Sequence, residues 1–301
     1  MRIFNPGTVD KLISKLIGLI PARMRGLFYR VPFLHAFLQK ALIRLLDPSV
    51  AKVRTISAGP LKNFKLEINI YNEKFYWLAT YEPRVQSCLQ QIITPGTVAY
   101  DVGAHIGYFS LLLSRLCGPE GRVLAFEPQP INYSRILKHI DLNRLKNVEV
   151  FPIALSNKMG VGVFRDQDKS AEGCLISSSP DFKLSGEDNS LLRSVRIISL
   201  DEFVFNQGHP LPGIIKIDTE GEEARIIDGM ERLLSVGRPI IVCEIHRPEL
   251  GTYIWRKLDK KDYHFIDIEK NMSSIIPQDN WDTHHLLAYP KELEPDLLFR
   301  S

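Results

Sequence analysis

The sequence predicts an α/β fold built on a parallel sheet. After Pro95-Gly96, apolar strands of five to eight residues alternate with helical stretches of about a dozen residues, which is the pattern of successive βαβ units. The chain of 301 residues is 45% hydrophobic and 24% charged, so it can bury a core and does not have the composition of a disordered protein. Its length fits one large domain with an appendage, or two domains of ordinary size.

The alternating elements can be placed along the chain in order. Strands are expected at Thr97–Val102, Arg122–Phe126, Val148–Ala154, Gly213–Ile217, Pro239–Ile245, Tyr263–Ile268 and His284–Tyr289. Helices are expected at Gly107–Leu116, Ile131–Asn143, Glu222–Leu234 and Pro248–Leu258. Residues 158–199 interrupt the alternation, because they hold only two strand-like pieces, Gly160–Arg165 and Ser194–Ser199. Such an insertion is either a mobile substrate loop or a surface excursion without a role.

A β-rich segment precedes the main domain. Apolar residues alternate from Phe64 to Tyr81 on both sides of the turn residues Asn72-Glu73, which predicts a β-hairpin. Together with a helix, this hairpin forms a lead-in over residues 51–95. The main domain then covers residues 96–301.

The N-terminal segment, residues 1–50, holds the basic excess of the chain. Its net charge is +6, whereas the remaining 251 residues sum to −3. Two amphipathic helices are predicted in it, Thr8–Ile20 and Phe33–Leu46. They either pack on the main domain as a cap or lie as basic surfaces against a membrane or a partner. No transmembrane span is expected, since the longest uncharged run near the N-terminus is nine residues and a span needs about 20.

Net charge, cysteine spacing and the N-terminal sequence predict which partners and which cellular compartment the protein has. The net charge of +3 is too balanced to indicate a nucleic-acid surface, so no nucleic-acid partner is expected. The four cysteines form no C-x-x-C pair and indicate neither a disulfide framework nor a zinc site. Because the sequence also shows no secretory signal, a cytoplasmic protein is expected, with peripheral membrane contact through residues 1–50 as the further possibility.

The strongest chemical signal lies at the end of the first predicted strand. That strand runs into the segment from Asp101 to Gly107, in which Gly103 and Gly107 let a ligand approach the backbone while the following helix offers free N–H groups. Twenty residues after Gly107, Glu127 follows the second strand, where a carboxylate can accept hydrogen bonds from both hydroxyls of a ribose. This order of residues indicates the adenosine half of a cofactor.

Asp101 distinguishes between two cofactors that contain adenosine. Its carboxylate would repel a pyrophosphate but attract the ammonium group of an aminoacyl tail. The third glycine of a G-x-G-x-x-G motif is also missing, since His105 stands between Gly103 and Gly107. The sequence therefore favours S-adenosylmethionine over NAD.

Five successive blocks resemble those of the FkbM family of methyltransferases: "DVGAHIGYFSLLLS", "VLAFEPQPINYSRILKHIDLN", "VEVFPIALSN", "SLDEF" and "IIKIDTEGEEARIIDGM". The resemblance covers about residues 75–246. It implies a Rossmann-like seven-stranded methyltransferase sheet that uses S-adenosylmethionine, commonly for O-methylation of sugars or natural products. It also implies a place for Glu82 near the cofactor. The family more often has Asn in the position of His105, and often reads "KIDVEGAE" at residues 216–223.

Acidic residues follow the fourth and fifth predicted strands. Because the carboxyl ends of strands in open α/β sheets face the ligand crevice, Asp218 is expected to meet the transferring methyl group or the acceptor. A hydroxyl acceptor must lose a proton, and either Asp218 or His246 could accept it. A rival role is metal binding, in which Asp218, Glu220 and Glu244 would hold Mg²⁺ and lower the pKa of the acceptor.

Other polar residues receive simpler interpretations. Glu222 and Glu223 are expected only to place acid in the first turn of the next helix, which the helix dipole favours. Ser156 and Asn157 follow the third strand, and either is expected to donate to an adenine edge. His139 lies within a predicted helix and is expected on its solvated side.

The sequence thus predicts an S-adenosylmethionine-dependent O-methyltransferase. Its acceptor would be a small molecule or glycan, through a hydroxyl of a sugar, of a glycan or lipid precursor, or of a natural product. The alternative is a catalytically silent docking module that keeps the methyltransferase fold and sits on a membrane or partner surface. The resemblance does not supply the acceptor, and the sequence does not predict the oligomeric state.

Overall fold

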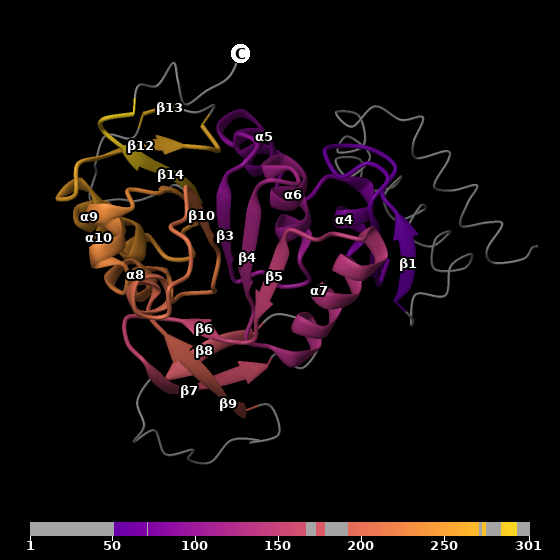
Figure 1. The fold of residues 1–301 in the computed structure, drawn as a ribbon, viewed down its shortest axis with the longest axis horizontal. Helices are drawn as coiled ribbons and strands as arrows, with labels where there is room; N and C mark the ends of the chain where they lie inside the picture. Colours follow the sequence, from indigo (N-terminus) through magenta and orange to yellow (C-terminus); the bar gives the residue numbers. More distant parts are fainter. Residues whose placement is uncertain are drawn as a thin grey trace, which may run out of the picture. The chain divides into compact units, whose positions relative to one another are not determined.

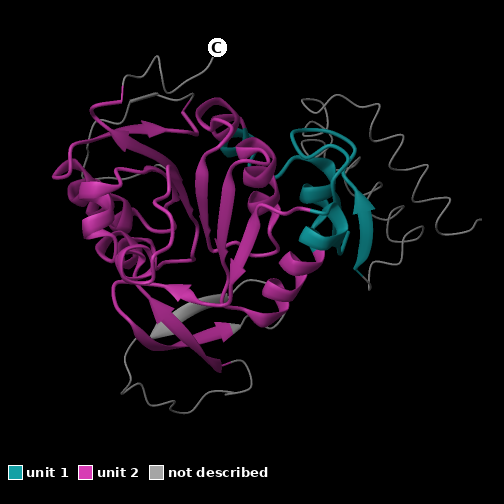
Figure 2. Ribbon diagram, in the orientation of Figure 1, with its two compact units in different colours: residues 1–86, 139–144 teal, residues 87–138, 145–301 magenta. Residues whose placement is uncertain are grey.

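The computed structural model describes residues 51–70, 72–166, 173–177, 192–270, 273–274 and 284–293. The chain forms two compact units (Figure 2): a small unit of residues 1–86 with 139–144, and a large unit of residues 87–138 with 145–301. The helices predicted within residues 1–50 lie outside the described residues. Within the described part of the chain, no helix is long and apolar enough to cross a membrane.

The large unit is built on one mixed sheet (Figure 1). Its seven longer strands are β3 (Val98–Val102), β4 (Arg122–Phe126), β5 (Val148–Phe151), β10 (Ile214–Ile217), β11 (Ile240–Glu244), β12 (Tyr263–Asp267) and β14 (His285–Pro290). They lie in the order β12-β14-β11-β10-β3-β4-β5, and the two-residue strand β13 (Ser273–Ser274) pairs with the outer edge of β12. β14 runs antiparallel to both neighbours. The predicted seven-stranded α/β sheet is therefore confirmed.

The helices of this unit cover both faces of the sheet. They are α6 (Tyr108–Cys117), α8 (Glu223–Asp228), α9 (Glu231–Val236) and α10 (Pro248–Asp259), with a π-helical turn at Glu202–Asn206. Most of α5 (Pro83–Ile92) and α7 (Pro130–Asn143) also belongs to this unit, whereas residues 83–86 and 139–143 belong to the small unit. Strand order reverses between β3 and β10, so right-handed connections place α6 and α8 on opposite faces. All four residues of β10 are buried, because helices pack on both faces of the sheet at this strand. The point where the strand order reverses, between β3 and β10, is where open α/β sheets bind their ligands.

One predicted helix is divided in two. The segment expected to be helical from Glu222 to Leu234 forms α8 and α9, which are separated at Gly229-Met230. A Cβ atom on Gly229 would lie 2.2 Å from the carbonyl oxygen of Ser156, so the backbone passes too close for a side chain. The carboxylate of Asp201 then accepts the N–H groups of Arg232 and Leu233 at 2.8 Å and caps the second helix.

The insertion contributes a second sheet. The strand expected to run from Val148 to Ala154 ends at Phe151, because Pro152 cannot continue the ladder. β6 (Ala154–Leu155), β7 (Gly160–Asp166), β8 (Gly173–Ser177) and β9 (Leu192–Ile198) form a four-stranded sheet in the order β6-β9-β7-β8. The two expected strand pieces are confirmed as β7 and β9, and β8 is an additional strand that the sequence pattern does not predict.

The small unit corrects two predictions. β1 (Lys52–Thr55) and β2 (Lys65–Ile68) form an antiparallel pair, whereas the segment expected to complete a hairpin with β2 is the helix α4 (Lys74–Leu78). Tyr76 and Trp77 are consecutive and both buried. In a strand with one buried face, consecutive side chains point to opposite faces and only one of the two would be buried. His139, expected to be solvated, is fully buried, and its Nε2 accepts the N–H of Glu67 at 2.9 Å.

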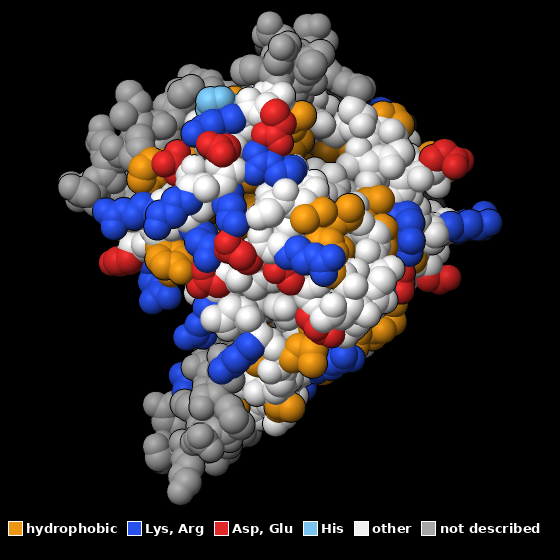
Figure 3. Space-filling model, turned by 60° about the vertical axis from the view of Figure 1, so that its left-hand side comes forward, with side chains coloured by type: hydrophobic (Ala, Val, Ile, Leu, Met, Phe, Trp, Pro, Cys, Tyr) orange, Lys and Arg blue, Asp and Glu red, His pale blue; other side chains and the backbone are white. Residues whose placement is uncertain are grey.

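Charges of both signs are mixed on the face of the molecule drawn in Figure 3. On α8 to α10 of the large unit, Lys257 lies 3.0 Å from Asp228 and 3.1 Å from Glu231, and Lys261, just after α10, lies 2.6 Å from Glu231. Exposed pairs of this kind contribute little to stability, on the order of 0–1 kcal/mol each. They do show that acidic and basic side chains neutralise one another on these helices.

Candidate functional site

The turn that follows β3 is held in a left-handed backbone conformation. Gly103 has φ 78°, His105 φ 51° and Gly107 φ 86°, and α6 starts at Tyr108. The N–H groups of Gly103 and Ala104 both donate to the carbonyl oxygen of Phe126, at 3.1 and 3.0 Å, which anchors the turn to the end of β4. His105 adopts a conformation that Asn and His reach more readily than most residues, so its presence leaves the turn intact.

Glu127 joins this turn to the end of β4. Its side chain is 5% exposed, and its two oxygens accept the N–H groups of His105 and Gln129, each at 2.8 Å. Burial raises the pKa of Glu127 to about 8, and the nearby negative charge of Asp101 contributes to this rise. The two backbone hydrogen bonds lower the pKa but do not offset the effect of burial. The carboxyl group also accepts a hydrogen bond from the side chain of Asn132, and its oxygens keep lone pairs for a further donor such as a hydroxyl.

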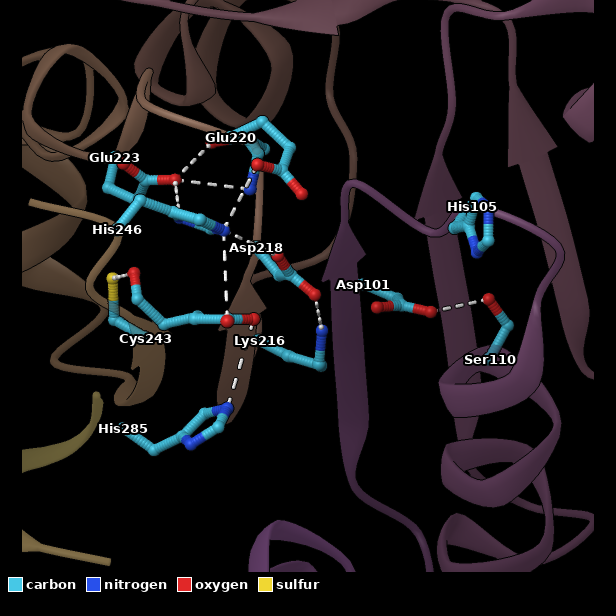
Figure 4. A network of polar contacts seen from close by, with 12 residues as sticks. Asp101, His105, Ser110, Lys216, Asp218, Glu220, Glu223, Cys243, His246 and His285 are labelled. Atoms are coloured by element: carbon cyan, nitrogen blue, oxygen red, sulfur yellow. Dashed lines mark hydrogen bonds and ion pairs between the residues drawn. The ribbon is translucent and has the colours of Figure 1, made fainter. Parts of the chain in front are cut away.

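Asp101 lies at the carboxyl end of β3 and is 1% exposed. Its Oδ2 accepts the hydroxyl of Ser110, on α6, at 2.5 Å (Figure 4). The predicted cofactor residues Asp101, Gly103, His105, Gly107 and Glu127 therefore belong to one connected group at the ends of β3 and β4. The sequence pattern does not single out Ser110, whose only signal is that it lies in the first turn of the helix after Asp101.

Two other predicted cofactor residues are placed differently. The hydroxyl of Ser156 is buried and donates to Glu222 at 3.1 Å, while Glu222 also pairs with Arg225 at 2.7 Å. Glu82 belongs to the small unit, where it precedes α5 with φ 38°. The adenine contact of Ser156 and the cofactor contact of Glu82 stay predictions.

A second group of charged side chains lies at the carboxyl ends of β10 and β11 (Figure 4). Lys216 is 4% exposed, its Nζ stands 3.0 Å from Oδ2 of Asp218, and it lies 4.5 Å from the centre of the Phe109 ring. Lys216 is the register partner of Asp101 on the adjacent strand β3. The structure thus brings the base candidate Asp218 to the strand beside the cofactor residues.

His246 lies among four carboxylates. Its Nδ1 is 3.0 Å from Glu223, and its Nε2 is 3.5 Å from Glu220, 3.6 Å from Asp218 and 3.8 Å from Glu244. Burial opposes the charged ring, but the hydrogen bond to Glu223 and the surrounding carboxylates raise the pKa of His246 to about 9. Histidine therefore carries a positive charge here at neutral pH.

Glu223 does more than complement a helix dipole. It is 0% exposed and reaches back to the segment between β10 and α8 as well as to His246. Although burial opposes its ionisation, the hydrogen bonds from His246 and Gly221 hold the pKa of Glu223 below its usual value. No local sequence pattern points to this role, because His246 lies 23 positions away.

The Mg²⁺ hypothesis rests on Asp218, Glu220 and Glu244. Two of these residues, Asp218 and Glu244, instead form a compact group with His246, in which the candidate ligand atoms lie within 4.8 Å of one another. The ammonium of Lys216 contacts Asp218, and the charged ring of His246 stands among the carboxylates. Two cationic side chains thus already neutralise this group, so its donor set does not fit a divalent cation in this protonation state.

Known methyltransferases are similar to this chain in sequence. Residues 101–265, more than half of the chain, match the family described as "Methyltransferase FkbM domain". "Hexuronic acid methyltransferase AglP" of Haloferax volcanii is 30% identical over 193 residues, which are 64% of this chain and 70% of that protein. "31-O-demethyl-FK506 methyltransferase FkbM" of Streptomyces tacrolimicus is 24% identical over 221 residues, covering 66% of this chain and 80% of that protein.

Among solved structures, the methyltransferase FkbM of Methylobacillus flagellatus KT is similar over 73% of this chain and 53% of its own length, with 16% sequence identity and a TM-score of 0.43. The match to the family and the similarity to the Haloferax protein both come from the sequence, and they are sufficient to assign this chain to the family. The strand order of the large unit agrees with the fold that the family resemblance implied. This chain belongs to the FkbM family of methyltransferases.

Proposed function

We propose that the protein transfers the methyl group of S-adenosylmethionine to a hydroxyl oxygen of a sugar, of a glycan or lipid precursor, or of a natural product. One observation carries the proposal. The N–H of Asp218 donates to the carbonyl oxygen of Val102 at 3.0 Å, so the acidic segment after β10 starts directly beside the glycine turn after β3. A donor-binding turn and a carboxylate that can accept a proton therefore share one edge of the sheet.

The donor would be held by the group around the turn. S-adenosylmethionine supplies a methyl group on a positively charged sulfonium, which an oxygen can attack in line. The buried carboxylate of Asp101 has the charge to bind the ammonium of the donor's amino-acid part. Glu127 has lone pairs for the ribose hydroxyls, and the turn presents backbone N–H groups at the start of α6. The chemistry of these residues fits the proposed cofactor.

Asp218 is the proposed proton acceptor. Burial works against its ionisation, but Lys216 at 3.0 Å holds the pKa of Asp218 below its usual value, so it is a carboxylate at neutral pH. A carboxylate can take the hydroxyl proton as the oxygen attacks the methyl group. His246, the other candidate base, already carries a proton at neutral pH and is less suited to accept one.

The relatives support an oxygen acceptor and a sugar. The name of the Haloferax protein gives a hexuronic acid as the methylated compound. The name of the Streptomyces protein gives 31-O-demethyl-FK506 as the methylated compound, and this compound lacks a methyl group on an oxygen. Identity of 30% or less does not carry a substrate from one protein to another, so the compound itself has to be found by assay.

The alternative is a docking module without activity, favoured by the basic residues 1–50. His105 is a reason to consider it, because the family more often has Asn there. However, His105 keeps the left-handed backbone conformation and its N–H donates to Glu127, so histidine at this position does not disrupt the turn. The active enzyme is therefore the better explanation of the site.

The experiment is calorimetric titration of the purified protein with S-adenosylmethionine and separately with NAD, each with and without Mg²⁺. We expect micromolar binding of S-adenosylmethionine, none of NAD, and no effect of Mg²⁺. Transfer from methyl-labelled donor to a panel of sugars, glycolipids and hydroxylated natural products then identifies the acceptor. D218N should bind the donor normally but lose transfer. Absence of donor binding would contradict the proposal and favour the docking module.

A further inference from the structure

One oxygen of Glu223 collects hydrogen bonds from two separate strand ends. Oε1 accepts the N–H of Thr219 at 3.2 Å, the hydroxyl of Thr219 at 3.2 Å and the N–H of Gly221 at 3.0 Å. It also lies 3.0 Å from Nδ1 of His246 (Figure 4). Thr219 and Gly221 follow β10, whereas His246 follows β11. The buried carboxylate therefore fixes both segments at once.

The segment that Glu223 holds is strained. Glu220 has φ 55° and Gly221 has φ 115°, two consecutive residues with positive φ. A residue other than glycine stays in this conformation only where its surroundings determine it. The N–H groups on either side of Glu220 both donate to Glu223, which supplies that constraint. Asp218 directly precedes the segment, so its position depends on the same contacts.

The orientation of His246 also follows from Glu223. A histidine whose Nδ1–H is held by a carboxylate has a defined ring position, and its other nitrogen points away from that carboxylate. In His246 that nitrogen, Nε2, lies 3.6 Å from Asp218 and 3.5 Å from Glu220. Glu244 is the remaining carboxylate near it, at 3.8 Å. The ring thus stands as a cationic bridge between the ends of β10 and β11.

We propose that Glu223 is a positioning residue, which holds the segment Thr219–Gly221 and the ring of His246 so that Asp218 is presented to the acceptor. The presentation to an acceptor rests on the proposed function, whereas the contacts themselves do not. The hydrogen bonds of Glu223 described above run to Thr219, Gly221 and His246. Glu223 therefore acts on Asp218 through these three residues.

The neighbouring residue provides a matched control. Glu222 is also buried and also a glutamate, but its carboxylate binds the hydroxyl of Ser156 and the guanidinium of Arg225. E222A removes a buried acid next to α8 without removing a contact to Thr219, Gly221 or His246. Any effect that E223A has and E222A lacks is then specific to the contacts of Glu223.

The test is NMR of the full chain, labelled with ¹⁵N and with ¹⁵N-histidine. At neutral pH, we expect a slowly exchanging proton on Nδ1 of His246, assigned by its absence in H246Q. In E223A this proton should become fast-exchanging, and the amides of Thr219 and Gly221 should exchange at least ten-fold faster. E223Q, which keeps an acceptor oxygen, should restore the protection of both amides, and E222A should leave all three signals unchanged.

Several outcomes overturn the proposal. The wild-type protein alone suffices, since finding no proton on Nδ1 of His246 excludes the contact even if E223A fails to fold. Unchanged amide exchange in a folded E223A, or the same change in E222A, would also exclude it. These readouts need neither donor nor acceptor. Failure to bind S-adenosylmethionine would therefore contradict the proposed function and leave the role of Glu223 standing.

Discussion

The backbone carbonyl of Asp218 lies against Gly103, and a Cβ atom on Gly103 would stand 1.7 Å from that oxygen. The segments that follow β3 and β10 therefore meet backbone to backbone at the point where the strand order reverses. Gly103 also has φ 78°, a left-handed conformation that side chains disfavour. Close approach and conformation both require glycine at this position.

G103A tests this contact. We expect it to lower the free energy of unfolding by the conformational cost of about 1 kcal/mol and by about 1–3 kcal/mol more for the clash, and to abolish binding of S-adenosylmethionine. G208A is the control, since Gly208 has φ 77° and a Cβ atom added there would meet nothing within 4 Å. Urea unfolding of both variants measures the difference, and equal losses of stability would show that the contact with Asp218 is unimportant.

D101A should weaken the binding of S-adenosylmethionine by ten-fold or more. The reason is the loss of a charged hydrogen bond, which contributes about 1.5–3 kcal/mol. S110A keeps the carboxylate of Asp101 and removes only the hydroxyl that binds it at 2.5 Å, so its effect should be smaller. Calorimetry measures both dissociation constants. Unaltered binding in D101A would remove Asp101 from the place assigned to the amino-acid part of the donor.

The sheet is predictable because its strands are buried on both faces. Such strands are short continuous apolar runs, and β4 is expected and found at Arg122–Phe126. The hairpin prediction is wrong because Phe75 and Trp77 alternate in the sequence as they would in a strand, yet five residues there form α4. The division between α8 and α9 escapes prediction because its cause, the approach of Ser156 to Gly229, is tertiary.

The candidate site is predictable to the extent that strand ends define it. Asp101 is the last residue but one of its strand, and Glu127 and Asp218 each follow another. The rule that strand ends face the ligand crevice groups the three from the sequence alone. Glu223 follows no strand directly, and its acidic side chain suits the first turn of a helix equally well. Its role depends on His246, which only the folded chain brings within 3.0 Å.

Residues 1–50 should bind anionic membranes. Their net charge of +6 and two predicted amphipathic helices favour a surface that carries acidic lipids. We expect the full chain to sediment with anionic liposomes, less so at high salt, and not with neutral ones. A chain of residues 51–301 should fold with a cooperative thermal transition but stay in the supernatant. Equal sedimentation of the two would exclude the membrane contact and favour the cap.

The charge on His246 should make the stability of the protein depend on pH in a specific window. Its pKa is raised from 6.5 to about 9 in the folded chain, so the folded state binds the proton more tightly than the unfolded state. The resulting stabilisation is fully present below about pH 6.5 and is lost as the pH rises through about 9. H246Q should therefore cost about 3 kcal/mol more stability at pH 6 than at pH 10, since each unit between the folded and unfolded pKa contributes about 1.4 kcal/mol. Urea unfolding of both proteins at each pH checks this, and the comparison at equal pH cancels the titration of Glu127. A difference between the two proteins that does not change with pH would mean that folding leaves the pKa of His246 at its unfolded value, and would return it to the candidate bases.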